Sequence, residues 1–70
     1  MNFREHFVFA HNAHIFNVTR QGCYNTVLIR QATGHHVWTV SVEAPPGTSR
    51  WDLAEAALKA FKNGQSQISI

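Results

Sequence analysis

The chain has 70 residues, a formal charge of +2 and only 14% charged residues. Its length predicts one small domain, residues 1–70, and so few charges argue against the dense basic surface typical of nucleic-acid-binding proteins. The single cysteine excludes an internal disulfide and predicts a reducing compartment. No long uncharged apolar run follows the first residues, so we expect no membrane span and a cytoplasmic location.

Two apolar runs at the start of the chain predict a β-hairpin. They cover residues 4–10 and 14–20, and Asn12-Ala13 between them predicts a two-residue loop. Such a loop sets the register, because each residue of one strand then has a defined neighbour on the other. The predicted neighbours are Phe7 with Val18 and Phe9 with Phe16.

The first strand has an alternative. Asn2 is a suitable N-cap for a helix over residues 3–10, in which Phe3 and Phe7 would lie one turn apart. The run Phe7-Val8-Phe9 has high β-propensity and favours the strand.

Two further strands are predicted at residues 23–31 and 35–43. A two-residue loop at Gln21-Gly22 would pair Arg20 with Cys23 and Phe16 with Val27. A second such loop at Thr33-Gly34 would pair Ile29 with Trp38 and Val27 with Val40, whereas a longer loop there would turn Trp38 away. The apolar face predicted by these registers consists of Phe16, Val18, Cys23, Val27, Ile29, Trp38, Val40 and Val42.

A helix follows the break at Pro45-Pro46-Gly47. Ser49 and Asp52 have the spacing of an N-cap and its partner, and Asn63-Gly64 predicts the end of the helix. Apolar residues at helical spacing form a stripe that must be buried, and charged residues lie opposite it. The stripe is Trp51, Leu53, Ala54, Ala57, Leu58 and Phe61; the charged residues are Asp52, Glu55, Lys59 and Lys62, with Glu55 placed to pair with Lys59.

These elements predict an α+β fold. We expect an antiparallel three- to four-stranded β-meander with one C-terminal amphipathic helix packed on one face. The tail carries Ile68 and Ile70 at strand spacing, so it either adds a short edge strand or lies over an edge of the core.

Histidines supply the candidate metal ligands. In the predicted register, His11 and His14 face each other at one end of the sheet, His36 lies about 10 Å away and His35 points to the other face. Cys23 lies at the opposite end. We therefore predict no metal and no cofactor. The four carboxylates form no close pair and no glycine-rich phosphate loop is present, so we also predict that the protein is not an enzyme.

The sheet face turned away from the helix is the candidate binding surface. It mixes apolar, aromatic, arginine and small polar residues, which is the composition of a contact surface rather than of a solvated face. The alternatives are that the tail or the N-terminal segment covers this face, or that it forms a homodimer. The predicted outer face is Ile15, Asn17, Thr19, Tyr24, Thr26, Leu28, Arg30, His35, Val37 and Thr39. The candidate partner-binding residues are Tyr24, Leu28, Arg30, His35, Val37 and Arg20.

In its size, single cysteine, lack of a catalytic constellation and layout of an antiparallel sheet with one helix, the chain resembles the small phage-encoded anti-CRISPR inhibitors. The resemblance covers the whole chain and includes no shared motif. It implies a stoichiometric inhibitor that acts in the host bacterial cytoplasm. Its partner would be a CRISPR effector complex, a protein or ribonucleoprotein, whose DNA binding or cleavage it blocks.

A small regulator that binds RNA or another nucleic acid through the open sheet face is the alternative function. RNA-binding sheets carry aromatic residues flanked by basic ones, and Tyr24, His35, Arg30 and Arg20 provide a sparse version of that pattern.

Overall fold

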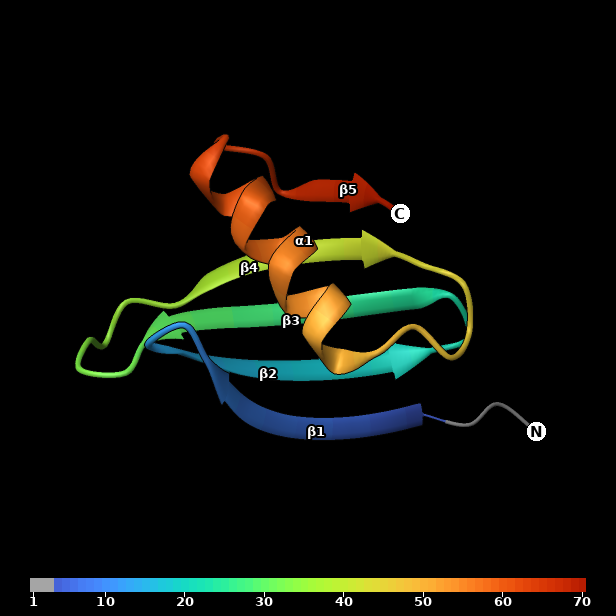
Figure 1. Ribbon diagram of the computed structural model, residues 1–70, viewed down its shortest axis with the longest axis horizontal. Coiled ribbons are helices and arrows are strands. Elements are labelled where there is room, and N and C mark those ends of the chain that lie inside the picture. The colour runs from blue at the N-terminus through green and yellow to red at the C-terminus, as the bar shows by residue number, and fades with distance from the viewer. Residues whose placement is uncertain (1–3) are drawn as a thin grey trace.

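Four consecutive strands form an antiparallel meander, and a short fifth strand joins its far edge in the computed structural model, which describes residues 4–70. The strands are β1 (Arg4–His11), β2 (His14–Gln21), β3 (Tyr24–Gln31), β4 (Trp38–Glu43) and β5 (Gln67–Ser69). The helix α1 (Arg50–Lys62) follows β4 in the chain and crosses one face of the sheet before the chain enters β5 (Figure 1). Because of this crossover, β4 and β5 pair in parallel. The α+β prediction is confirmed, with five strands instead of three or four.

The first hairpin has the predicted register. Phe7 pairs with Val18 and Phe9 with Phe16, around a loop of Asn12 and Ala13. Both loop residues have positive φ, 51° and 60°, as a type I′ turn requires. Residues 4–10 are therefore strand, and the helix alternative is wrong for them because the whole run pairs with β2. The proposed cap Asn2 and the residue Phe3 lie outside the described residues.

The register between β2 and β3 corrects the prediction by two residues. Phe16 pairs with Ile29 instead of Val27, and the loop is Gly22-Cys23 instead of Gln21-Gly22. Gly22 has a φ of 63°, which suits the first position of a type II′ turn. A shift of two residues leaves every side chain on its original face, so the hydrophobic pattern could not distinguish the two registers. Cys23 lies in the turn and not in the strand.

Between β3 and β4 the register is as predicted but the loop is not. Val27 pairs with Val40 and Ile29 with Trp38. The two-residue loop at Thr33-Gly34 is wrong, because residues 32–37 form a longer connection outside the β3–β4 pairing. The backbone N–H of Ala32 donates to the carbonyl oxygen of Ala13 at 3.0 Å, which continues the β2–β3 pairing by one position into the β1–β2 turn.

The core lies between the sheet and α1. Side chains that alternate along the strands meet the apolar stripe of the helix, which excludes water from both. The fully buried large side chains are Phe16, Val18, Val27, Ile29, Val40, Val42 and Leu53. The predicted stripe is wrong at Trp51, which is 52% exposed. Ala60 is buried, although it was not predicted to belong to the stripe.

Both ends of α1 follow the sequence signals. The hydroxyl of Ser49 accepts a hydrogen bond from the backbone N–H of Asp52 at 3.1 Å. At the other end, Gly64 has a φ of 69° and its N–H donates to Phe61, while the N–H of Gln65 donates to Ala60. These two bonds form a Schellman motif, which reverses the chain toward β5. Ile68 then pairs with Val42 and packs on the core, so the tail adds the edge strand.

Candidate functional site

The sheet face opposite α1, here called the open face, is the candidate site. Within residues 4–70, no outer-face side chain of β1 to β4 is buried, because α1 occupies the other side (Figure 1). Neither β1 nor β5 covers this face, since both are strands of the sheet. Its side chains come from alternate strand positions, which is why they are free of the core.

An apolar hollow lies near one end of the open face. Its volume is about 190 Å³, and its walls come from three adjacent strands and from the β3–β4 connection. Asn17 lies between Val8 and Leu28 in neighbouring strands, and Ile15 is opposite Arg30. The residues that line it are Val8, Ile15, Asn17, Leu28, Ile29, Arg30 and Val37. Val8 and Val37 are 54% and 48% exposed, so a large part of this apolar surface faces solvent.

Three of the six candidate residues meet at this hollow. Leu28 and Arg30 follow each other on the outer side of β3, and Val37 reaches them from the connection that follows. The predicted register also placed Val37 opposite Arg30 on the outer face, so their proximity was expected although the predicted loop is wrong. The structure brings together an apolar surface and a cationic group.

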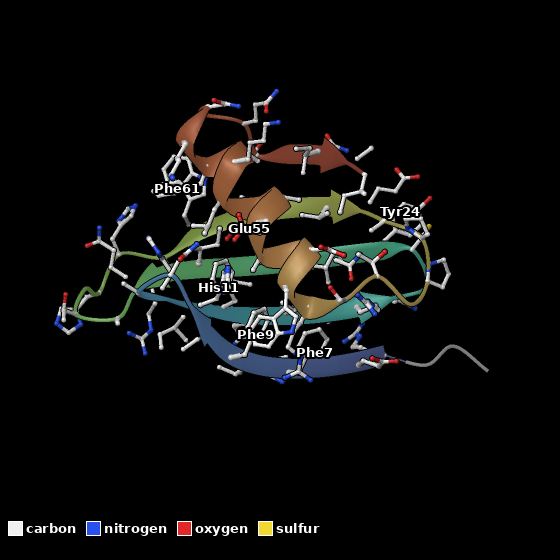
Figure 2. All side chains as sticks on the ribbon, viewed as in Figure 1. Phe7, Phe9, His11, Tyr24, Glu55 and Phe61 are labelled. Atoms are coloured by element: carbon white, nitrogen blue, oxygen red, sulfur yellow. The ribbon has the colours of Figure 1, made fainter. Side chains whose placement is uncertain are left out.

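Tyr24 lies on the same face but apart from the hollow. It begins β3, six residues before Arg30, which corresponds to about 20 Å along an extended strand. Figure 2 shows its side chain at the end of the sheet away from the β1–β2 turn. Its strand neighbour there is Glu43, and it is 66% exposed.

Arg20 lies on the other side of the sheet and not on the open face. Its Nε donates to Asn25 Oδ1 at 2.7 Å, and its second guanidinium nitrogen donates to the carbonyl oxygen of Thr48 at 2.7 Å. The guanidinium carbon also lies 5.9 Å from the centre of the Phe7 ring. Arg20 therefore holds the segment before α1 against the sheet, a role that the strand pattern did not reveal.

His35 lies in the β3–β4 connection and not in the strand that was predicted for residues 35–43. Together with Arg30, Trp38 and Phe61 it lines a second hollow, of about 250 Å³, at the end of the sheet. Its neighbour His36 is also exposed, and its ring centre lies 6.2 Å from that of Trp38. Because neither histidine is in a strand, the alternation that was expected to separate them does not apply.

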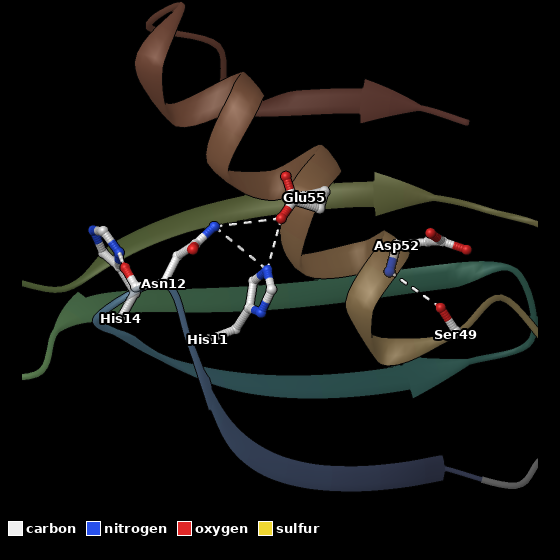
Figure 3. A network of polar contacts seen from close by, with 6 residues as sticks. All are labelled: His11, Asn12, His14, Ser49, Asp52 and Glu55. Atoms are coloured by element: carbon white, nitrogen blue, oxygen red, sulfur yellow. Dashed lines mark hydrogen bonds and ion pairs between the residues drawn. The ribbon is translucent and has the colours of Figure 1, made fainter.

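A polar network that sequence reasoning missed joins the β1–β2 turn to the helix (Figure 3). His11 Nε2 lies 2.6 Å from Glu55 Oε1, and the side-chain amide of Asn12 donates to the same oxygen at 3.3 Å. His14 Nδ1 donates to the carbonyl oxygen of Asn12 at 2.6 Å. Glu55 thus contacts a residue 44 positions away, whereas helical spacing had assigned it to Lys59. No local signal could have found this pair.

The histidines of the first hairpin face each other as predicted, because His11 pairs with His14. Among residues 4–70, no three His, Cys, Asp or Glu side chains gather closely enough to hold a metal ion. Within the same residues, α1 is too short and too polar to cross a membrane.

The comparisons with known proteins give no relative: no protein-family model, no curated protein and no solved structure matches this chain.

Proposed function

We propose that the chain is a non-catalytic protein-binding module whose open face binds one protein partner. The observation that supports this is the apolar hollow between Val8, Ile15, Leu28 and Val37, which has a cationic group at its rim. Exposed apolar side chains that gather around a depression, and are not scattered singly, are typical of a contact surface.

Arg30 indicates the chemistry of the partner. Its side chain is exposed, and its hydrogen bond within the described residues is a long one, 3.4 Å from Nη1 to the carbonyl oxygen of Gln31. Most of its donors are therefore available to a ligand. A guanidinium binds a carboxylate through two parallel hydrogen bonds, and the hollow beside it accepts an apolar side chain. The expected partner surface presents an apolar side chain next to an Asp or Glu.

Two placements favour protein over nucleic acid as the partner. Arg20, one of the two arginines of the RNA-binding alternative, is engaged with Asn25 and Thr48 on the helix side. Tyr24, the residue best suited to stack on a base, lies at the far end of the face from Arg30. A binding surface for single-stranded nucleic acid needs basic and aromatic residues along one continuous path.

The class of partner that we propose is a CRISPR effector complex, which the chain would inhibit by occupying a surface needed for DNA binding or cleavage. The support is the resemblance of the whole layout, one small domain with a sheet and a helix, to the anti-CRISPR inhibitors. A stoichiometric inhibitor works by binding alone, so it needs a contact surface. The hollow is a candidate for that surface.

The test uses purified, guide-loaded effector complexes of several types and measures binding by biolayer interferometry and DNA cleavage in parallel. We expect stoichiometric inhibition of one type. Arg30→Glu and Val37→Asp should each weaken binding about tenfold or more, as residues central to an interface do. The matched control is Ser41→Asp, which adds the same charge to the same face outside the hollow.

Two results would contradict the proposal. If binding survives both hollow variants, the open face is not the binding surface. If the chain binds no effector complex but retains RNA that is lost at high salt, the nucleic-acid alternative is correct.

A further inference from the structure

The strand β1 forms an edge of the sheet, and its only charged residues, Arg4 and Glu5, lie at its start, so the rest of the edge lacks the usual protection. It is eight residues long, pairs with β2 at every position and contains neither proline nor glycine. Natural edge strands are commonly short, charged, bulged or interrupted by proline, because an exposed edge attracts another strand. The opposite edge follows this rule, since β5 has three residues.

Apolar side chains lie on both faces of β1. Phe7 and Phe9 point to the helix side, while Val8 and Ala10 point to the open face. An edge strand normally has one wet face, whereas strands inside a larger assembly are apolar on both sides. The middle of β1, Phe7 to Ala10, therefore resembles a strand that is buried on both faces, whereas Arg4, Glu5, His6 and His11 flank it with polar side chains.

The backbone of β1 also has groups directed away from β2. In a hairpin with a two-residue loop, the flanking residues exchange hydrogen bonds, here His11 and His14. Hydrogen-bonded positions alternate along an antiparallel strand, so the odd-numbered residues of β1 face β2. The N–H and C=O groups of Arg4, His6, Val8 and Ala10 therefore face the open edge.

The helix leaves an aromatic group uncovered beside this edge. The Trp51 ring meets Phe9 edge-on at 5.5 Å between centres, yet half of Trp51 is exposed. The Arg50 guanidinium lies 5.4 Å from the centre of the Phe7 ring. Figure 2 shows Phe7 and Phe9 along β1, beside the start of α1. A neighbour at this edge would cover the exposed parts of Trp51 and Phe7.

We propose that β1 pairs antiparallel with β1 of a second copy, about a two-fold axis that passes through Val8. In this register Val8 opposes Val8 of the other copy, and Phe7 opposes Phe9 twice. Glu5 opposes His11, so a carboxylate meets an imidazole at each end of the pairing. A two-fold axis requires such self-complementarity, and aromatic cross-strand pairs stabilise neighbouring strands.

The neighbouring register supports this choice of axis. Moving the axis to Phe7 would place Glu5 opposite Phe9 and His6 opposite Val8. It would leave one Phe7–Phe7 pair in place of two Phe7–Phe9 pairs, and it would lose the Glu5–His11 pairs. With the axis at Val8, the two helices lie on the same side of one continuous sheet. The two hollows then lie side by side on the other face, because Val8 lines each of them.

The experiment measures mass against concentration by sedimentation velocity and light scattering. The pairing of one strand is a small interface, so we expect a reversible equilibrium. The mass should rise from 7.9 kDa toward twice that value between micromolar and millimolar concentrations. A mass of 7.9 kDa throughout that range would overturn the proposal.

The register has its own test. Val8→Lys and Val8→Glu should each be monomeric, because two like charges meet at the axis, and an equal mixture of the two variants should recover the dimer. Thr39→Lys and Thr39→Glu are the matched controls, since Thr39 is on the same face in β4, away from the edge. Ala10→Lys, at the edge but outside the hollow, should also weaken the dimer. Dimers that persist in all three edge variants would show that another surface is responsible and overturn the proposal.

Discussion

The two faces of this sheet are built from the same strands and differ in the burial of their side chains. On the helix side, Phe16, Val18 and Val40 have no exposed surface. On the open side, within residues 4–70, the strands β1 to β4 have no buried side chain. One apolar face and one helix are therefore enough for a core, and the side chains of the second face are not needed to build it.

The difference in burial between the two faces is clearest within β3. Val27 and Ile29 are buried under α1, while Leu28 and Arg30, one position away, line the hollow on the other side. Alternation alone separates the residues that maintain the fold from those that we assign to binding. Substitutions on the two faces should therefore affect different measurements.

The largest effect is expected where a charge enters the covered side. Leu58→Asp places a carboxylate against the sheet and should cost on the order of 3–5 kcal/mol, as other uncompensated buried charges do. A domain of this length has roughly 4–10 kcal/mol in total, so this variant should be largely unfolded at ordinary temperature. Circular dichroism during heating measures this.

The matched control is the next residue. Lys59→Asp adds the same carboxylate to the exposed side of α1 and should melt nearly as the wild type does. A native-like melt of Leu58→Asp would show that the helix does not pack on this face.

An intermediate effect on stability is expected at Arg20, which was predicted to bind the partner together with Arg30. Arg20→Met removes the hydrogen bonds to Asn25 and Thr48, and Asn25 is only 2% exposed. Losing a partner of a buried polar group costs about 1–3 kcal/mol. The melting temperature should fall by several degrees, since ~1 kcal/mol corresponds to roughly 4–8 °C in a small domain.

Arg30→Met is the control on the open face. It should leave the melt within a degree or two and reduce partner binding instead. Equal melts for the two variants would contradict the assignment of Arg20 to the fold.

The smallest effect is expected at the pair that ties the first hairpin to the helix. Glu55→Gln keeps the shape of the side chain and removes its charge beside His11, whose side chain is 26% exposed. Partly exposed ion pairs contribute less than about 1 kcal/mol. Urea unfolding should therefore show a small decrease, and a decrease above ~2 kcal/mol would mean that this contact organises the hairpin.

Local patterns predicted the faces of the sheet better than its connections. Alternation identified Val18, Val27 and Val40 as core residues, and spacing identified the cap at Ser49 and the end at Gly64. These features depend on neighbours within a few positions, which a single sequence contains.

The features that were missed are ones that hydrophobic periodicity does not determine. A register shift of two residues keeps Phe16 and Ile29 on the core face, so periodicity could not reveal it. The connection at residues 32–37 is longer than the two-residue loop that would have fitted the same register. The hollow was partly predicted, through Leu28, Arg30 and Val37, whereas the contributions of Val8 and Ile15 require the arrangement of three strands.

The most direct test of the central claim, that the open face binds and the helix side maintains the fold, is a map of the bound surface. The measurement is the set of amide chemical-shift changes in ¹⁵N-labelled chain when a purified effector complex that it inhibits is added. We expect the largest changes at Val8, Leu28, Arg30 and Val37, with little change at Lys59 and Lys62. Changes concentrated on the exposed side of α1, with the hollow unaffected, would contradict the account.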